Sequence, residues 1–373
     1  MKKNIAIIEN HIISTNTVRQ KLTAELIAAG YNVTVLSTGT SKELDIARAK
    51  GFHVIDVGTS NTRPMDVLRY MKNLRKHLKE TNADVCLTFT MRPAIWGNMI
   101  TRLMNIPTIT NITGIGPLAQ SDSAVYKIAR TLYKFVLKKT SKVFFQNEDD
   151  RNLFLNKKFV IPQQVEIIPG SGIDYEYFVP LPKKRNDDKF VFLFISRLIK
   201  DKGILEYVEA ARILKEQNIV AEFQVLGPYY SQNLKENIIT EKEIVKWVED
   251  GTVIYLGAAT DVRPFIAEAD CIVLPSYREG MSNVLLEAAS MQKPAVTCNT
   301  TGCKDIVVEG ETGYLCKVAD AADLAEKLER MLRLPKEDRQ HMGEKAREVV
   351  KTKFAKQIVV DAYLKAIEEA IKK

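Results

Sequence analysis

The chain has 373 residues, of which 46% are hydrophobic and 27% charged, with a net charge of +8. Its length exceeds the size at which one hydrophobic core stops growing, so two domains are expected. The composition is that of a soluble globular protein, and no segment approaches the roughly 18 apolar residues of a membrane-spanning helix. The positive charge permits nucleic acid, an anionic membrane or an acidic substrate as partner, and its distribution along the chain must decide among them.

The cysteines and histidines indicate neither a disulfide framework nor a metal site. The five cysteines include no Cys-x-x-Cys pair, and the four histidines are scattered. The N-terminal segment has too few apolar residues for a secretory leader and is typical of a first strand. We therefore expect reduced cysteines, no metal, and a cytoplasmic protein that is either free or bound peripherally to the inner face of the cell membrane.

The first half of the chain alternates short apolar segments with amphipathic ones. This alternation predicts an α/β domain with a doubly wound parallel sheet. A turn-rich segment and a polar, proline-containing run then end the first domain near residue 180. The predicted strands are 5–8, 33–36, one within 48–57, 85–89, 107–111 and 143–146, and the predicted helices are 18–29, 67–79, 93–104 and 124–139.

The alternation restarts at residue 190, after a polar run that has the composition of a linker. It predicts a second doubly wound domain over residues 181–356, followed by a last helix. The predicted strands are 190–195, 222–226, 253–256, 271–274 and 295–297, and the predicted helices are 204–217, 241–248, 262–267, one after residue 283, 321–332, 336–350 and 357–372.

One stretch of the second domain, LPSYREGMSNVLLEAAS, joins a strand end, a loop and a helix start. Gly280 allows a sharp turn, and Ser282 and Asn283 are good N-cap residues for the following helix. The first N–H groups and the positive end of that helix suit a diphosphate. Glu279 in the loop and Glu287 about one turn into the helix can then accept hydrogen bonds from the hydroxyls of a sugar nucleotide.

These two glutamates, with E-G-M-S-N-V after the first, resemble the signature of the retaining glycosyltransferases of family four, the glycosyl transferases group 1. Two doubly wound domains resemble their GT-B fold, in which the domains face each other across a cleft. The resemblance implies that Glu287 holds the ribose and Glu279 contacts the donor sugar. It also implies an acceptor-binding domain over 1–180, a nucleotide-sugar domain over 181–356, and a helix over 357–373 that packs back on the first domain.

Other residues of the second domain match the family at the same predicted sheet edge. Arg197 and Lys202 follow the domain's first strand, where a guanidinium and an ammonium can neutralise a diphosphate leaving group. The turn at Gly257 resembles the family's base-binding turn. We assign further donor contacts to the loop and helix start at Gly280, Met281, Ser282 and Asn283.

The first domain departs from the family pattern in its first loop, which lacks the glycine pair that many members place near the phosphates. Asn10, His11, Ser14 and Thr15 would have to serve instead.

A second departure lies at Met91, where many relatives carry a histidine. The neighbouring Arg92 is either a phosphate ligand or a structural residue. Gly114 lies in an N-I-T-G-I-G stretch that is similar to one in bacterial relatives acting on polyprenyl-diphosphate sugars.

The predicted helix over 124–139 carries a basic stripe, and no acidic residue occurs from 123 to 147. Ile128, Leu132 and Phe135 are expected to form its apolar face. A stripe of one sign suggests an anionic membrane surface or a lipid diphosphate as partner, although a basic helix that only aids solubility is the alternative. The stripe consists of Lys127, Arg130, Lys134 and Lys138.

The resemblance implies a retaining glycosyltransferase that moves a hexose or N-acetylhexosamine from a nucleotide sugar, with UDP the expected nucleotide. The expected acceptor is a polyprenyl-diphosphate-linked glycan in bacterial surface polysaccharide synthesis. In the front-face mechanism the leaving diphosphate takes the acceptor proton, so no protein base is required, and no metal or other cofactor is expected. The alternatives are a UDP-sugar 2-epimerase of the same fold and a basic nucleic-acid-binding protein, for which the sequence shows neither aromatic platforms nor a groove-reading helix.

Overall fold

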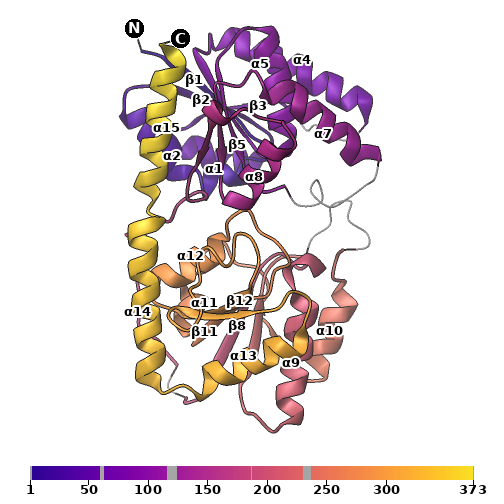
Figure 1. Cartoon of the computed structure of the whole chain (residues 1–373), viewed down its shortest axis with the longest axis vertical. Coiled ribbons are helices and arrows are strands. Elements are labelled where there is room, and N and C mark those ends of the chain that lie inside the picture. The colour runs from indigo at the N-terminus through magenta and orange to yellow at the C-terminus, as the bar shows by residue number, and fades with distance from the viewer. Residues whose placement is uncertain (1, 59–62, 116–123, 186, 230–236, 373) are drawn as a thin grey trace. The chain divides into compact units, whose positions relative to one another are not determined.

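A computed structural model describes residues 2–58, 63–115, 124–185, 187–229 and 237–372 (Figure 1). The chain forms two compact units, one of residues 1–171 with 356–373 and one of residues 172–355. Each unit has its own parallel sheet, which confirms the predicted doubly wound α/β class. No helix of the described part is long and apolar enough to cross a membrane.

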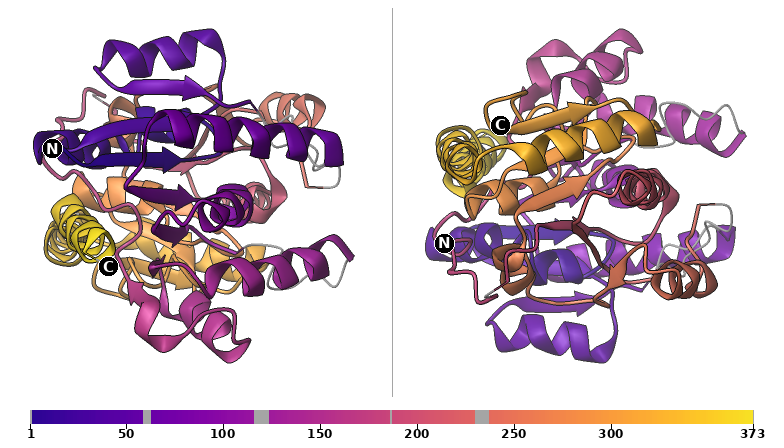
Figure 2. Two further views of the ribbon diagram at one scale, coloured as in Figure 1. Left: turned by 90° about the horizontal axis from the view of Figure 1, so that it is seen from above. Right: turned by 90° about the horizontal axis from the view of Figure 1, so that it is seen from below.

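The first unit contains, among the described residues, a seven-stranded parallel sheet of order β3-β2-β1-β4-β5-β6-β7 (Figure 2). The strand order reverses between β1 and β4, and ligands of such sheets bind beyond the carboxyl ends of the strands at that point. The strands are β1 (Asn4–Ile8), β2 (Asn32–Ser37), β3 (His53–Asp56), β4 (Val85–Phe89), β5 (Thr108–Ile112), β6 (Lys142–Phe145) and β7 (Val165–Ile167).

Helices cover both faces of this sheet, which buries its strands in two layers of apolar side chains. Helices α4, α5 and α7 pack on one face, and α2, α3 and α15 pack on the other (Figure 1). The helices are α1 (Ile13–Asn16), α2 (Gln20–Ala28), α3 (Ser41–Ala49), α4 (Pro64–Glu80), η1 (Pro93–Gly97), α5 (Asn98–Leu103), α7 (Ala124–Leu137), α8 (Glu148–Asn156), η2 (Pro162–Gln164) and α15 (Lys356–Ile371).

The last helix, α15, belongs to the core of the first unit. Tyr363 is 1% exposed, and its ring lies 5.8 Å from that of Phe89 and 4.9 Å from that of Phe144. Its hydroxyl accepts a hydrogen bond of 2.9 Å from the amide of Asn111. Aromatic contacts of this kind stabilise a core beyond the area that they bury. The chain thus leaves the first unit after Ser171 and returns to it at Lys356.

The second unit contains, in its described part, a six-stranded parallel sheet of order β10-β9-β8-β11-β12-β13, with the reversal between β8 and β11. Its strands are β8 (Val191–Ile195), β9 (Glu222–Leu226), β10 (Ile254–Tyr255), β11 (Cys271–Leu274), β12 (Ala295–Cys298) and β13 (Gly313–Cys316). Its helices are η3 (Lys200–Lys202), α9 (Ile204–Glu216), α10 (Glu241–Glu249), α11 (Arg263–Glu268), α12 (Asn283–Ser290), α13 (Ala321–Arg333) and α14 (Lys336–Lys353).

The polar run predicted as a linker is attached to the second unit by ion pairs. Lys183 pairs with Asp270 at 2.9 Å, and Arg185 pairs with Glu222 at 2.7 Å. The backbone N–H of Arg185 also donates to the carboxylate of Glu268 at 3.0 Å. These contacts explain why the division between the units lies at residues 171 and 172, ahead of that run.

Candidate active site

Residues predicted for the donor site come together at the carboxyl edge of the second sheet. Lys202 follows β8 and Glu279 follows β11, the two strands that flank the point where the strand order reverses. The Lys202 ammonium forms an ion pair with Oε1 of Glu279, and the two side chains are only 15% and 14% exposed. The Ser276 hydroxyl donates to the same oxygen at 2.7 Å. Arg197 lies earlier in the loop after β8, with an exposed side chain.

Direct packing of the loops after β8 and β11 holds this ion pair. The backbone N–H of Tyr277 donates to the carbonyl of Asp201 at 2.9 Å. Gly203 has a φ of 74°, and a Cβ there would lie 2.1 Å from the carbonyl oxygen of Pro275. Only glycine fits so close an approach in that backbone conformation. The two loops are therefore fixed next to each other, and with them Lys202 and Glu279.

A third loop, residues 299–303 after β12, is hydrogen-bonded to the backbone around Glu279, and we call it the clasping loop. The N–H of Glu279 donates to the carbonyl of Thr301 at 3.0 Å, and the N–H of Ser282 donates to that of Gly302 at 3.1 Å. Gly302 has a φ of 77°, and a Cβ on it would lie 2.6 Å from the carbonyl oxygen of Glu279. The loop after β12 therefore positions the loop that carries Glu279.

Helix α12 begins where the sequence predicts. Ser282 is its N-cap, with Oγ accepting from the N–H of Leu285 at 3.4 Å, and Asn283 is its first residue. No acidic residue lies in its first turn, so the partial positive charge of the helix start is not met by a carboxylate from that turn. Gly280 and Met281 lead into the helix, and Glu287 is half-buried within it.

The predicted base-binding turn lies at the same edge of the sheet, beyond β10. Gly257 has a φ of 76°, and its carbonyl accepts from the N–H of Gly227 at 2.8 Å. Gly227 in turn approaches the carbonyl of Ser196 so closely that a Cβ would lie 1.7 Å from it. A chain of backbone contacts therefore connects the Gly257 turn to the loop that carries Arg197.

Cys303, at the end of the clasping loop, is fully buried. Burial, and after it the neighbouring Glu279 carboxylate, raises the pKa of the Cys303 thiol to about 12. The thiol therefore stays neutral at physiological pH and adds no charge beside the ion pair of Lys202 and Glu279.

Two residues predicted to bind substrate lie in the first unit. Arg92 follows β4 and Gly114, with a φ of 119°, follows β5, so both are at the carboxyl edge of the first sheet. Met91 packs against the apolar cluster under α7. Thr90 has a φ of 69°, which is a strained conformation for a β-branched residue. The last glycine of the N-I-T-G-I-G stretch, Gly116, lies outside the described residues.

A buried ion pair, which sequence reasoning missed, holds the first loop. Glu9 and Arg19 pair at 3.0 Å with side chains 0% and 6% exposed. Burial raises the pKa of the Glu9 carboxyl, although Arg19 opposes the shift. Thr15 donates its hydroxyl to Glu9 at 2.6 Å and His11 lies 3.8 Å from Glu43, so these two proposed phosphate ligands have partners within the unit.

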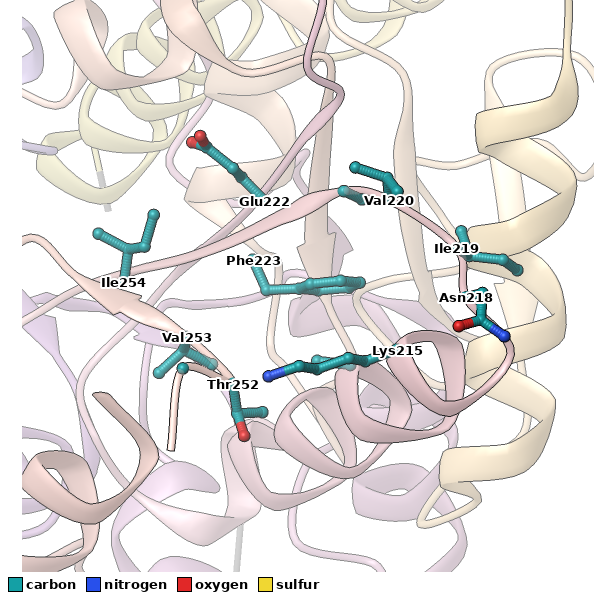
Figure 3. A pocket seen from close by; sticks show the side chains of 12 residues that line it. Lys215, Asn218, Ile219, Val220, Glu222, Phe223, Thr252, Val253 and Ile254 are labelled. Atoms are coloured by element: carbon teal, nitrogen blue, oxygen red, sulfur yellow. The ribbon is translucent and has the colours of Figure 1, made fainter. Parts of the chain in front are cut away.

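The described residues form no metal site, and the cavity of the second unit lies away from this edge. Among the described residues, no group of three or more histidine, cysteine, aspartate or glutamate side chains gathers as a metal site would require. A cavity of about 450 Å³ lies at the opposite, amino end of the second sheet, between the end of α9 and the starts of β9 and β10 (Figure 3). Lys215, Phe223 and Ile254 line it, and none of the predicted site residues does.

Comparison with known proteins identifies both halves of the chain. Residues 5–147 match the family model "Glycosyl transferase 4-like" and residues 181–349 match "Glycosyl transferases group 1". The capsular polysaccharide biosynthesis glycosyltransferase CapM of Staphylococcus aureus is 31% identical over 51% of this chain, and the match spans only half of that relative.

Two further relatives are matched over more of their length. UDP-Gal:alpha-D-GlcNAc-diphosphoundecaprenol alpha-1,3-galactosyltransferase of Escherichia coli is 28% identical over 69% of both chains. N,N'-diacetylbacillosaminyl-diphospho-undecaprenol alpha-1,3-N-acetylgalactosaminyltransferase of Campylobacter jejuni is 25% identical over 86% of both.

Solved structures share the fold along the whole chain. A glycosyltransferase from Rickettsia africae superimposes with a TM-score of 0.81 at 18% identity over 100% of this chain and 99% of its own. Anabaena HepE in complex with UDP-glucose superimposes with a TM-score of 0.79 at 14% identity. The match covers 98% of this chain and 99% of HepE. At these identities the likeness shows the fold, that of two Rossmann-like domains of GT-B type. The chain therefore belongs to the glycosyltransferases, with a glycosyl transferase 4-like domain followed by a glycosyl transferases group 1 domain.

Proposed function

We propose that the protein is a retaining glycosyltransferase that moves a hexose or N-acetylhexosamine from a UDP-sugar to a polyprenyl-diphosphate-linked glycan. The half-buried pair of Lys202 and Glu279 beside the start of α12 carries this proposal. The names of the Escherichia coli and Campylobacter jejuni relatives support the lipid-linked acceptor, and the UDP-glucose complex of HepE supports the donor. Synthesis of a bacterial surface polysaccharide is the corresponding role.

In the proposed donor complex, the diphosphate occupies the start of α12 and meets the cations of Arg197 and Lys202. Lys202 then exchanges the Glu279 carboxylate for phosphate oxygens. Glu279, still held by Ser276 and by its backbone contacts, becomes an acceptor for hydroxyls of the donor sugar. Glu287 accepts hydrogen bonds from the ribose, and the base lies against the turn at Gly257.

The transfer itself follows from this arrangement. The acceptor hydroxyl oxygen attacks the anomeric carbon from the face that the diphosphate leaves, which retains the configuration. The bond from that carbon to the diphosphate breaks as the new glycosidic bond forms, and the acceptor proton passes to the departing phosphate oxygen. Arg197, Lys202 and the helix start stabilise the charge that develops there, so we propose that neither a metal ion nor a protein base takes part.

The acceptor is assigned to the first unit, where Arg92 and Gly114 lie at the carboxyl edge of the sheet. Because a polyprenyl acceptor is confined to a membrane, we propose a cytoplasmic protein that binds peripherally to the inner face of the cell membrane. The basic stripe faces that membrane in this proposal; it consists of Lys127, Arg130 and Lys134 on α7 and of Lys138, which directly follows the helix.

Transfer assays with a panel of radiolabelled nucleotide sugars, with and without polyprenyl-diphosphate-linked acceptors, test the proposal. We expect label in the lipid-linked product only when the acceptor is present, and equal transfer after treatment with EDTA. Lys202→Ala should abolish transfer, while Lys200→Ala, two residues away in the same turn, should not. Conversion of the nucleotide sugar without acceptor would instead identify an epimerase, and loss of transfer in EDTA that magnesium restores would show that these cations do not replace a metal.

A further inference from the structure

Helix α12 is held at its C-terminal end as well as at its start. Its N-cap, Ser282, is bonded to the clasping loop, whereas its last residue, Ser290, is fully buried at the other end of the helix. Helix α14 packs against α12 (Figure 1). The last carbonyl groups of a helix have no partner within it and carry a partial negative charge, so they need a donor from elsewhere.

Arg347 of α14 provides that donor. Its Nη1 donates to the carbonyl of Ser290 and, at 3.4 Å, to the hydroxyl of the same residue. The same nitrogen donates to the carbonyl of Phe178 at 3.1 Å, and Nη2 donates to the carbonyl of Tyr175 at 3.1 Å. One guanidinium thus joins the end of α12 to residues 175–178, close to where the second unit begins in the chain.

Two further contacts fix the same end of α12. The Ser290 hydroxyl donates to the carbonyl of Phe178 at 2.7 Å. On α14, one turn before Arg347, a Cβ on Gly343 would lie 2.0 Å from the carbonyl oxygen of Gln292. Only glycine lets α14 approach the turn after α12 so closely. The C-terminal end of α12 is therefore held by two successive turns of α14.

The surroundings of Arg347 are unusual for a half-buried charge. Every oxygen that its guanidinium binds in the described part of the chain belongs to a carbonyl or a hydroxyl, and none belongs to a carboxylate. Burial lowers the pKa of Arg347 from its usual range. Removing a cation from water without an opposite charge is costly, and the carbonyl dipoles at the end of α12 offset that cost. The arginine and the end of α12 therefore depend on each other's position.

A second arginine of α14 makes the same kind of contact with a different helix. Nη1 of Arg339 donates to the carbonyls of Leu332 and Leu334, at the end of α13. Its guanidinium lies 5.0 Å from the ring centre of Phe190. None of the predicted site residues lies on α13. Arg339 is thus a matched control, because it is also half-buried and also bound to carbonyls at a helix end.

The position of α12 matters because one rigid helix carries two proposed donor contacts. Its first N–H groups face the diphosphate in the proposed complex, and Glu287, three residues before Ser290, faces the ribose. A shift of the helix at its C-terminal end moves both contacts together. Binding groups have to be held within about 0.5 Å of their productive geometry by the side chains that support them.

We propose that Arg347 is a positioning residue of the donor site. By joining the C-terminal end of α12 to residues 175–178, it fixes where the start of α12 and Glu287 meet the nucleotide. This inference rests on the proposed function, which takes α12 as the helix that binds the diphosphate and the ribose. Lysine cannot replace this arginine, because a single ammonium lacks the planar fork that binds Ser290 and Tyr175 from two nitrogens.

Calorimetric titration of the full chain with UDP tests the proposal. The variants are Arg347→Met and Arg347→Lys, and the controls are Arg339→Met and Arg339→Lys. Ser290→Ala removes one hydroxyl from the same junction and no charge, so it keeps the test open if Arg347→Met does not fold. Thermal unfolding of every variant measures the general loss of stability alongside UDP affinity.

We expect both Arg347 variants to bind UDP about tenfold more weakly, as when one charge-assisted hydrogen bond to the nucleotide is lost. Their KM should rise for the donor and not for the acceptor. Ser290→Ala should weaken UDP binding about threefold, as for one neutral hydrogen bond. The Arg339 variants should bind UDP like the wild type, even where they lose as much thermal stability.

Three results would overturn the positioning role. The first is wild-type UDP affinity in Arg347→Met or, if that variant does not fold, in Ser290→Ala. The second is wild-type affinity in Arg347→Lys, because charge alone would then account for the effect. The third is an equal loss of affinity in Arg339→Met and Arg347→Met, which would reflect a general loss of stability.

Amide hydrogen exchange without nucleotide separates this inference from the proposed function. Arg347→Met should speed exchange in α12 and leave α13 unchanged, and Arg339→Met should do the reverse. A wild type that binds no UDP and transfers no sugar, with α12 still loosened by Arg347→Met, would refute the proposed function and not the hold of Arg347 on α12. Wild-type UDP binding together with unchanged exchange of α12 in Arg347→Met would refute the positioning role alone.

Discussion

Lys202 and Glu279 neutralise each other in the structure, although the proposed donor complex gives each a different partner. An ion pair that is largely removed from water contributes little net stability but is costly to break on one side only. The donor supplies both replacements at once, since its phosphates are anionic and its sugar carries hydroxyls. If the proposed function is correct, the pair discriminates between a whole nucleotide sugar and either of its halves.

The first prediction concerns Glu279→Gln. The substitution removes the charge that holds Lys202 and weakens the hydrogen bonds to the donor sugar. A charge-assisted hydrogen bond contributes about 1.5–3 kcal/mol, so turnover should fall about 10- to 100-fold. The affinity for UDP should be unchanged or higher, because Lys202 no longer has to leave a carboxylate. Calorimetric titration with UDP and transfer kinetics measure the two effects, and a parallel loss of both would contradict the assigned role.

Gly302 and Gly310 form a matched pair that tests the clasping loop. Both have positive φ angles, 77° and 75°, so replacement by alanine strains the backbone of each by about 1 kcal/mol or more. Only at 302 would the new methyl group also meet the carbonyl of Glu279; at 310 no described atom lies within 4 Å. We expect Gly302→Ala to lower the transfer rate at saturating donor and Gly310→Ala to leave it unchanged. Equal rates for the two variants, at equal thermal stability, would show that the clasp has no role in turnover.

The charged residues of the candidate site were predictable, while the groups that hold them were not. Glu279, Glu287, Arg197 and Lys202 occur at recognisable spacings after apolar strands. Ser276 and Thr301 are common residue types whose role exists only once the loops pack together. The pair of Glu9 and Arg19 was missed for another reason. A charge next to a buried strand is expected to be solvated unless its partner is known.

At the scale of single elements, apolar alternation identified most strands and helices but not those with a weak apolar pattern. Strand β7 was missed because its residues are only half-buried, and β13 was missed because it directly follows a turn-rich segment. Helices α3 and α8 were missed because they bury few apolar residues, although each has an N-cap side chain, Thr40 and Asn147, that signals a helix start. On α7 the core contacts come from Tyr133 and Val136, whereas Ile128 and Phe135 of the predicted apolar face are 62% and 56% exposed.

The segment before β8 leads to a prediction about pH. Hydrogen bonds from Arg185 lower the pKa of Glu222 to about 2, from 4.5 for an unperturbed carboxyl. A lowered folded-state pKa contributes stability above the unfolded value, and this contribution is lost as the pH falls from about 4.5 to about 2. Glu222→Gln should therefore lower the free energy of unfolding at pH 7 by about 1–3 kcal/mol, with the difference vanishing toward pH 2.

Denaturant unfolding of wild type and variant across this pH range measures the effect. Asp187→Asn is the control, because Asp187 pairs with the same arginine at 2.8 Å but is 47% exposed. Asp187→Asn should lower the free energy of unfolding at neutral pH by less than Glu222→Gln does. A difference between wild type and Glu222→Gln that persists at pH 2 would mean that the loss is one of packing and not of charge.

At the scale of the whole molecule, each unit is a doubly wound sheet. The first unit is not one continuous stretch of the chain. The first unit is assembled from both ends of the sequence. The family resemblance implied this return of the last helix, whereas the apolar pattern alone predicted only that a helix exists. Its partners cannot be read locally, because Asn111 and Tyr363 are 252 residues apart.

The last prediction follows from this discontinuity. Tyr363→Ala removes a buried ring that contacts Phe89 and Phe144, and deletion of a large core side chain costs about 3–5 kcal/mol. The loss should fall on the first unit, to which all three residues belong. Ile358→Ala on the same helix is the control, because its side chain is 40% exposed. Amide hydrogen exchange should show faster exchange in β4, β5 and β6 of Tyr363→Ala and unchanged exchange in β8 and β11. Equal acceleration in both units would show instead that the two sheets unfold as one cooperative structure, and the core that α15 completes would then stabilise the entire chain.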